Sequence, residues 1–196
     1  MLPEGAVTPR YARRIMGLDD TEGLFVANVA VDAEAHSALP HNIYRLHTGR
    51  DGALQDGVFY QLRPGLGDKN LLMIITKSLF SEWQPWEETI TGRRGAAYGN
   101  EKVRRADRLV KEAAGIFGPL NGAKVLDAYT PLTIRDWVNS PQGSPYGIVR
   151  SSRQLHAATL LHHVNLKGLF FAGQNALSPG ALGTLLGSFQ TVRQMI

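Results

Sequence analysis

The C-terminal end of the chain carries the pattern that most limits its fold. An apolar run, Leu169–Ala172, predicts a buried strand that stops at Gly173, and a helix is expected from the following turn to Ile196. A strand that leads through a glycine-bearing turn into a helix N-terminus can bind phosphate or another electron-rich group. Glycine lets the backbone approach closely, and the first N–H groups of a helix have no internal partner. Many such turns bind nothing, so the pattern needs a second signal.

The composition is that of a soluble globular domain. The 196 residues are 43% hydrophobic and 19% charged, so the chain is long and apolar enough to bury a core of its own. The formal net charge is only +4, which argues against nucleic acid as a partner. The chain has no Cys, which excludes disulfides, thiolate metal sites and cysteine nucleophiles.

The sequence shows neither a secretion signal nor a membrane span. Met1–Gly5 lacks the charged and apolar regions of a signal peptide. The longest apolar runs are strand-sized, well below the roughly twenty residues of a membrane-spanning helix. We therefore expect a cytoplasmic protein. One helix face carries Arg104, Arg105 and Arg108, but acidic residues interleave with them, which favours a solvated face and leaves peripheral contact with a membrane open.

Periodicity and helix-breaking residues predict an α+β fold. The expected helices are Pro9–Gly17, with Thr8 as N-cap, and Asn100–Phe117, in which apolar residues recur every three or four positions. The expected strands are Gly23–Val31, Val58–Leu62, Asn70–Lys77 and Ala123–Tyr129, with a polar loop over Asp32–Gly57. Clustered strands followed by one long helix are typical of α+β proteins rather than of strict βαβ alternation.

The second signal lies in two segments that precede the terminal pattern. Thr130–Trp137 reads TPLTIRDW, Gly143–Gly147 reads GSPYG, and Gly173–Gly183 reads GQNALSPGALG. In this order and at this spacing, the three segments resemble the C-terminal part of the phytoene desaturase-like flavoprotein oxidoreductases. Within that family they are most similar to the branch of the retinol saturases (all-trans-retinol 13,14-reductases) and carotenoid isomerases. The resemblance covers the final part of the chain well and the earlier part only loosely.

The resemblance implies how the chain is organised. Residues 1–150 would be a substrate-binding-domain-like portion with a mixed or antiparallel sheet and helices. Residues 151–196 would be the terminal strand, turn and helix of a FAD/NAD(P)-binding, Rossmann-like domain. The G-x-G-x-x-G unit that such enzymes use to bind FAD is missing, since Gly92, Gly95 and Gly99 have the wrong spacing. The chain therefore looks like the C-terminal part of a longer enzyme.

Two functions follow from this organisation. The resemblance implies that the complete protein is an FAD-dependent oxidoreductase that desaturates, saturates or isomerises C–C bonds of an apolar polyene or isoprenoid, with NAD(P) left open as a second cofactor. Its partners would be that substrate and the missing N-terminal FAD-binding half or subunit. The alternative is a catalytically silent interaction subunit or fragment that needs an FAD-binding partner, or that associates as a homo-oligomer. The absent dinucleotide motif favours this second interpretation.

The resemblance also implies which residues contact the ligands. Gly173, Gln174 and Asn175 would lie along the FAD ribityl and phosphate groups. The N–H groups that would face the flavin ring belong to Gly180, Ala181, Leu182 and Gly183. Tyr146 is the candidate for substrate contact, since a phenol can orient a substrate, and Trp83 or Trp86 could line the substrate cavity. No residue is assigned as general acid or base.

Other polar residues have a structural interpretation. We expect Pro131 to end a strand and Thr133 to cap a short helix, and we expect structural roles for Thr130, Thr133 and Asp136. The histidines lack the spacing of a zinc site: His36, His41, His47, His156, His162 and His163. No G-x-S-x-G elbow surrounds any Ser, which argues against a hydrolase of that type.

Overall fold

The computed structural model describes residues 5–156, 161, 164 and 166–196. The chain divides into two compact units. The larger unit is Glu22–Gly143, and the smaller one combines Met1–Thr21 with Ser144–Ile196. The division therefore falls at Thr21 and Gly143, whereas the sequence suggested a boundary after residue 150. The roles expected for the two portions remain predictions.

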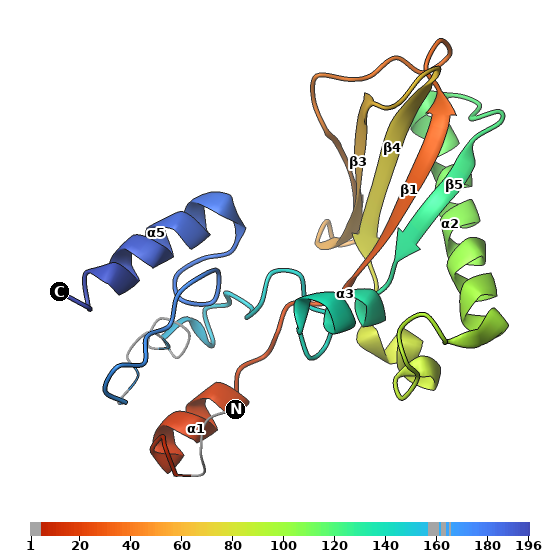
Figure 1. Ribbon diagram of the computed structural model, residues 1–196. Coiled ribbons are helices and arrows are strands. Elements are labelled where there is room, and N and C mark those ends of the chain that lie inside the picture. The colour runs from red at the N-terminus through yellow and green to blue at the C-terminus, as the bar shows by residue number, and fades with distance from the viewer. Residues whose placement is uncertain (1–4, 157–160, 162–163, 165) are drawn as a thin grey trace. The chain divides into compact units, whose positions relative to one another are not determined.

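The larger unit is built on a five-stranded antiparallel sheet in the order β2-β3-β4-β1-β5. Its strands are β1 (Leu24–Asp32), β2 (Ile43–Thr48), β3 (Leu54–Pro64), β4 (Lys69–Lys77) and β5 (Lys124–Tyr129). Figure 1 shows β1 between β4 and β5, with α2 (Gly95–Phe117) packed along the sheet. The mixture of helices with an antiparallel sheet confirms the predicted α+β class.

The core lies between α2 and one face of the sheet. Alternate residues of β1 are buried, among them Ala27 and Val29. Ala27 pairs with Ile74 and Val29 with Leu72, and these β4 residues are also fully buried. Because side chains alternate across a strand, this register gathers the apolar side chains of neighbouring strands on one face. On α2, the buried residues at helical spacing are Ala106, Leu109 and Ala113.

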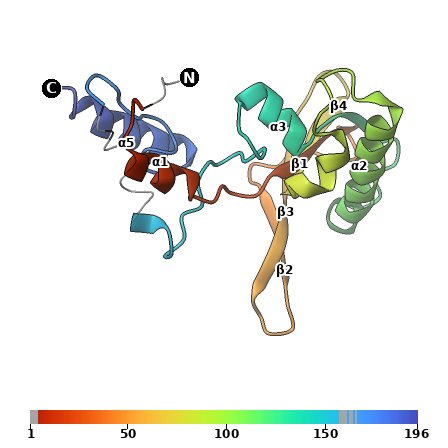
Figure 2. The same cartoon turned by 90° about the horizontal axis from the view of Figure 1, so that it is seen from below.

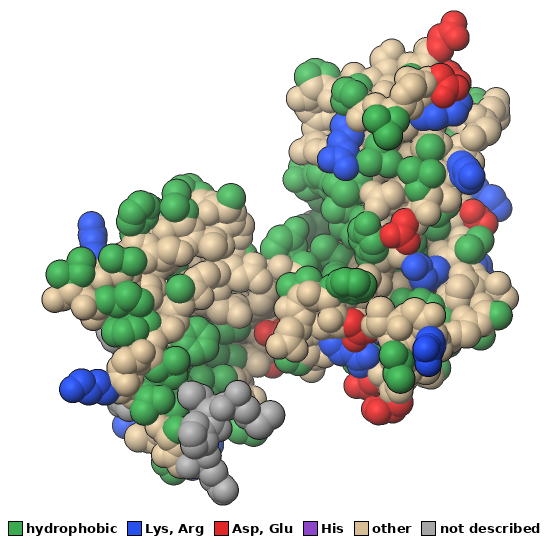
Figure 3. Space-filling view, in the orientation of Figure 1, with side chains coloured by type: hydrophobic (Ala, Val, Ile, Leu, Met, Phe, Trp, Pro, Cys, Tyr) green, Lys and Arg blue, Asp and Glu red, His purple; other side chains and the backbone are tan. Residues whose placement is uncertain are grey.

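The opposite face of the sheet is also rich in apolar side chains, and they are half-buried or exposed. This open face holds Tyr44, Leu46, Phe59, Leu24, Val26, Ala30, Leu71, Met73 and Ile75. Figure 3 shows hydrophobic side chains gathered over the strands of this unit. A sheet with two apolar faces differs from the ordinary alternation, in which one face meets solvent.

One strand was missed in the sequence. The stretch Asp32–Gly57 was expected to be a loop, and that prediction was wrong: it contains β2 and the start of β3. Figure 2 shows β2 and β3 extending together as a two-stranded ribbon. Apolar and polar residues are mixed along β2, and Tyr44 packs edge-on against Phe59 of β3. The His47 Nδ1–Asp56 Oδ1 pair also spans the strands at 2.5 Å. Because no residue of β2 is buried, the sequence lacks a buried apolar pattern there.

The long helix starts earlier than expected, at Gly95 rather than Asn100. Its first turns contain Tyr98, whose ring packs edge-on against Trp83 and Trp86. These tryptophans belong to η1, a 3-10 helix at Phe80–Trp86. Trp83 is fully buried and stacks on Phe25. Tertiary packing of aromatic rings thus stabilises helix over a glycine-bearing stretch that propensity disfavours.

Within its described residues, the smaller unit includes the helices α1 (Pro9–Met16) and α5 (Gly180–Val192). Thr8 caps α1 as predicted, accepting a hydrogen bond from the Tyr11 N–H. An antiparallel bridge joins Asp20 to Ile148, and a small core forms around Ile148 and Leu161. The hydroxyl of Tyr11, on α1, donates to the Leu161 carbonyl at 3.1 Å.

The predicted terminal strand at Leu169–Ala172 is wrong, because these residues form no strand. A strand needs a neighbour that pairs with its backbone, and within the described ranges no segment pairs with them in a ladder. Instead, the Thr191 hydroxyl of α5 donates to the Phe171 carbonyl at 2.6 Å. Helix α5 ends at Val192, before the expected Ile196. None of the helices in the described part of the chain is both long and apolar enough to cross a membrane.

Candidate functional site

The TPLTIRDW segment forms the start of α3 (Pro131–Val138). Thr130 is the N-cap: its Oγ1 accepts from the Thr133 N–H at 3.3 Å, while Thr133 Oγ1 accepts from the Thr130 N–H at 3.2 Å. The prediction that Thr133 caps the helix was therefore wrong, since Thr133 completes a capping box that Thr130 begins. Pro131 opens the helix at its first position, which suits a residue without an N–H.

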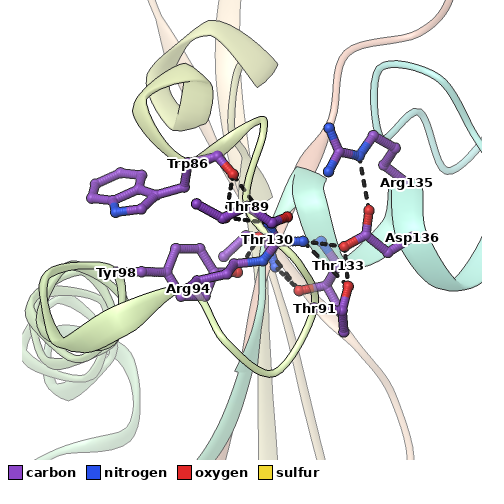
Figure 4. Close-up of polar contacts among 9 residues, drawn as sticks. All are labelled: Trp86, Thr89, Thr91, Arg94, Tyr98, Thr130, Thr133, Arg135 and Asp136. Carbon is purple, nitrogen blue, oxygen red and sulfur yellow. Dashed lines mark hydrogen bonds and ion pairs between the residues drawn. The ribbon is translucent and has the colours of Figure 1, made fainter.

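A buried ion pair ties this helix to the loop before α2. The Arg94 guanidinium pairs with the Asp136 carboxylate, and the two side chains are 5% and 18% exposed. Arg94 also donates to the Trp86 carbonyl at 3.1 Å and to the Thr89 carbonyl at 2.9 Å (Figure 4). Because these donors meet acceptors, the cost of burying the charge is offset. Structural roles for Thr130, Thr133 and Asp136 agree with these contacts.

The electrostatics of Asp136 fit a permanently ionised structural carboxylate. Burial disfavours its charged form, but the Thr91 hydroxyl and the Arg135 guanidinium bond to it, and the charges of Arg94 and Arg135 add to their effect. Together they hold the pKa of Asp136 below its ordinary value. A carboxylate with a lowered pKa and filled hydrogen-bonding positions is poorly suited to act as a general acid.

Two hollows lie beside this ion pair. One has a volume of about 620 Å³ and is lined by residues of the loop before α2, the first turns of α2, β5 and α3. The other, of about 420 Å³, is an apolar groove between α3 and the ends of β1 and β5. Both are lined by Tyr129, Thr133 and Trp137. Trp83 lines neither: its indole N–H donates to Ser78 Oγ at 2.9 Å in the core.

In the smaller unit, the GSPYG and GQN segments meet. The Asn175 Oδ1 accepts from the Ile148 N–H at 3.1 Å, and the Gln174 Nε2 donates to the Pro145 carbonyl at 3.3 Å. Gly147 has a φ of +68°, and a Cβ at this position would lie 1.9 Å from Asn175 Oδ1. Glycine suits this backbone conformation, and any larger residue would also displace the Asn175 side chain from its bond to Ile148. Tyr146, the predicted substrate residue, is on this turn and half exposed.

A second clasp holds the same turn from the N-terminal side. The Thr21 and Ser144 hydroxyls are 2.7 Å apart, and Ser144 Oγ also donates to the Gly147 carbonyl at 2.9 Å. The Thr21 N–H donates to that carbonyl at 2.7 Å. The segment that precedes the sheet and the segment that follows it are therefore bonded to each other.

Arg150 is a residue that sequence reasoning missed. Its Nη2 donates to the carbonyls of Gln174 (3.3 Å) and Asn175 (3.1 Å). Its Nε and Nη1 atoms are buried and have no hydrogen-bond partner among the described residues. Burial lowers the pKa of this guanidinium. The arginine fixes the backbone of the GQN turn at the expense of two unsatisfied donors, and a lone Arg after a turn gave no signal of this in the sequence.

The N-terminus of α5 presents its backbone outward. Pro179 is the N-cap and supplies no side-chain hydrogen bond, so the first N–H groups are left for another acceptor. Gly180, Ala181 and Leu182 are exposed, whereas Gly183 is buried with its Cα against the Ser178 carbonyl, where a Cβ would lie 2.4 Å from the oxygen. Glycine at 183 thus lets the turn fold back tightly on the helix.

The described residues contain no cluster of three or more His, Asp or Glu side chains that could hold a metal ion. His162 and His163 lie outside these residues. The expectation that the histidines are not zinc ligands stays a prediction.

The chain is similar to curated all-trans-retinol 13,14-reductases. It is 23% identical over 125 residues to the enzyme of Rattus norvegicus, which covers 62% of the chain and 20% of that relative. It is 24% identical over 190 residues to the enzyme of Danio rerio, which covers 88% of the chain and 31% of that relative. The chain thus spans less than a third of the length of these relatives. No protein-family model and no solved structure matches it. The similarity supports the retinol-saturase branch of the resemblance seen in the sequence motifs.

Proposed function

We propose that the chain is the C-terminal portion of an FAD-dependent oxidoreductase that acts on C–C bonds of an apolar polyene or isoprenoid. The observation that carries the proposal is the junction of the GSPYG and GQN segments next to the uncapped N-terminus of α5. The two proteins with similar sequences support it, since both are named as reductases of all-trans-retinol.

The residues of α5 fit the proposed cofactor. Gly180, Ala181 and Leu182 would offer backbone N–H groups and the positive end of the helix dipole, which stabilise negative charge on an electron-rich ring or phosphate. Gln174 and Asn175 would act through their backbone, because their side chains already bond to the GSPYG turn. When bound, FAD supplies hydride transfer. This chain would orient the cofactor and stabilise negative charge on the part of it that faces the helix N-terminus.

The open sheet face supports an apolar substrate. Its half-buried side chains, such as Phe59, Met73 and Ile75, offer hydrophobic contact without hydrogen-bonding groups. Burying such a surface against a polyene is favourable because it removes apolar area from water on both sides.

The test is an FAD titration of the purified chain, followed by flavin fluorescence, with and without the N-terminal half of the Danio rerio relative. We expect saturable binding only with that half present. In the complex, Ala181→Glu should weaken FAD binding at least about tenfold, because it places an anion at the helix end proposed to face the cofactor. Met195→Glu, at the exposed far end, is the matched control and should change binding less than about twofold.

Each other result has a definite meaning. Tight binding by the chain alone would refute the expectation that it lacks the FAD site. Equal FAD affinity for both variants would refute the contact with α5. A negative charge near its N-terminus stabilises a helix, so loss of FAD binding in Ala181→Glu would not come from unfolding.

One observation favours the alternative, an interaction subunit. Helix α5 carries an exposed apolar stripe at helical spacing: Leu182, Leu185, Leu186, Phe189 and Val192. Exposed stripes of this kind mark surfaces that pack against another element or chain. If the chain is a subunit that associates through this stripe, Phe189→Lys should shift its sedimentation from an oligomer to a monomer without any dependence on FAD.

A further inference from the structure

The Arg150 guanidinium is a cation without a counter-charge among the described residues. Its Nη2 donates to the carbonyls of Gln174 and Asn175, whereas its buried Nε and Nη1 atoms have no hydrogen-bond partner in that part of the chain. No described carboxylate pairs with it either. A buried charge without a partner destabilises a fold, and groups that break a local rule in this way are concentrated at functional sites.

The two hydrogen bonds that Arg150 makes fix the orientation of the GQN turn. The turn is closed by the Ala176 N–H, which donates to the Gly173 carbonyl at 3.1 Å. In a planar trans peptide the carbonyl and the N–H point in opposite directions. The bond from Arg150 to the Gln174 carbonyl therefore directs the Asn175 N–H away from the guanidinium. No described atom accepts this N–H, which leaves it for a ligand.

We infer that Arg150 is a positioning residue of the proposed FAD site. It holds the carbonyl side of the GQN turn, so that the Asn175 N–H faces the cofactor, and its charge stabilises the cofactor more in the reduced state than in the oxidised state. This role rests on the proposed function, which places the cofactor at this turn. It makes the reduction potential of the bound flavin depend on a residue outside the three sequence motifs.

The surroundings of the guanidinium make its charge effective beyond its own contacts. Reduction adds electrons to a flavin, and positive charge nearby stabilises the negative charge that results. Burial weakens the screening of the Arg150 charge by water, and no described carboxylate cancels it. Burial also lowers the pKa of this guanidinium, but arginine stays protonated in proteins. The planar guanidinium can bond to two carbonyls at once, which a compact ammonium does less well.

The test compares three variants of the chain in the complex with the N-terminal half of the Danio rerio relative. Arg150→Met should weaken the binding of oxidised FAD about threefold, and that of reduced FAD about tenfold more than that. This tenfold difference lowers the two-electron reduction potential of the bound flavin by about 30 mV. Arg150→Lys keeps the charge and should retain most of the potential. Arg153→Met, the matched control, removes an equal charge from a side chain that is 87% exposed and should change neither property.

Urea unfolding separates this role from a structural one. Replacing a buried group that lacks partners by an apolar side chain is close to neutral for folding, so Arg150→Met should unfold at nearly the same urea concentration as the unchanged chain. A large loss of stability would assign Arg150 a structural role and overturn the inference.

The measured potentials decide the rest. The inference would also be overturned by an unchanged potential in Arg150→Met, by equal effects of Arg150→Met and Arg153→Met, or by a loss of potential in Arg150→Lys as large as that in Arg150→Met. In each of these cases the unchanged complex binds FAD, so the proposed function stands. If the unchanged complex bound no FAD, the proposed function would fail and the role of Arg150 with it.

Discussion

Replacing Gly147 by Ala should disrupt the junction of the GSPYG and GQN segments. The new Cβ would lie 1.9 Å from Asn175 Oδ1, and the residue would have to keep a φ of +68°. The left-handed backbone costs an alanine about 1 to 2 kcal/mol. The Asn175 side chain can relieve the overlap by moving away, which breaks its bond to the Ile148 N–H and costs about 1 to 3 kcal/mol more. Together these contributions predict a loss of about 2 to 5 kcal/mol in the free energy of unfolding.

Gly168→Ala is the matched control for this prediction. Gly168 also has a positive φ, +83°, but no described atom lies within 4 Å of the point that a Cβ would occupy there. It should therefore lose only the backbone contribution of about 1 to 2 kcal/mol. The assay is urea unfolding, together with hydrogen exchange of the Ile148 amide, which reports local opening of the junction. Equal losses for the two variants, or unchanged protection of that amide in Gly147→Ala, would refute the reasoning.

Three further predictions concern the larger unit. Asp136→Asn leaves the buried Arg94 charge without its ion pair and should lower the free energy of unfolding by about 3 to 5 kcal/mol in urea titrations. Thr130→Ala removes the helix cap and the 2.8 Å contact with the Tyr98 hydroxyl and should cost about 1 to 3 kcal/mol, whereas Thr130→Ser should be nearly neutral. Hydrogen bonds from Arg104 and Arg105 lower the pKa of Glu101 to about 2, from an ordinary value of 4.5. The stability that it contributes is therefore fully present above about pH 4.5 and lost as the pH falls toward 2, and Glu101→Gln should flatten this part of a pH–stability curve.

Controls and contrary outcomes for these predictions follow the same physical reasoning. Asp19→Asn breaks an exposed, 3.7 Å ion pair with Arg153 and should cost less than about 1 kcal/mol. An equal effect of this change and Asp136→Asn would contradict the role given to burial. A Thr130→Ser variant as unstable as Thr130→Ala would contradict the capping argument. If Glu101→Gln loses as much stability as the unchanged protein when the pH falls from about 4.5 toward 2, that pH dependence comes from other carboxylates.

Periodicity predicted the elements that build the core. The strand expected at Gly23–Val31 buries alternate residues, and the helix expected at Asn100–Phe117 buries Ala106, Leu109 and Ala113. Periodicity failed to predict segments whose structure depends on pairing with residues that are distant in the sequence. The hairpin strand β2 has no buried residue, so no alternation of buried and exposed positions signals it. The apolar run Leu169–Ala172 has the composition of a strand but, among the described residues, no partner in a ladder, so composition alone misled the prediction.

The site was predictable in its motifs and less so in its contacts. The order of TPLTIRDW, GSPYG and GQN identified segments that matter, and the structure joins the last two through Gln174 and Asn175. The sequence did not reveal Arg94, which directly follows Arg93 in the chain yet is almost fully buried. Its burial depends on acceptors from η1, the following loop and α3, which are distant in sequence and cannot be read from local spacing.

The clasp between Thr21 and Ser144 has a topological consequence. These residues stand on either side of the sheet unit, and their hydroxyls are only 2.7 Å apart. The sheet unit is thus an uninterrupted insertion whose entrance and exit are neighbours in space. Such an insertion can be replaced by a short linker, or lengthened, without disrupting the fold of the host unit, the smaller unit that carries it. A protein in which Gly-Ser joins Thr21 directly to Ser144 would keep the host unit closed, while the sheet unit could vary its exposed surfaces independently.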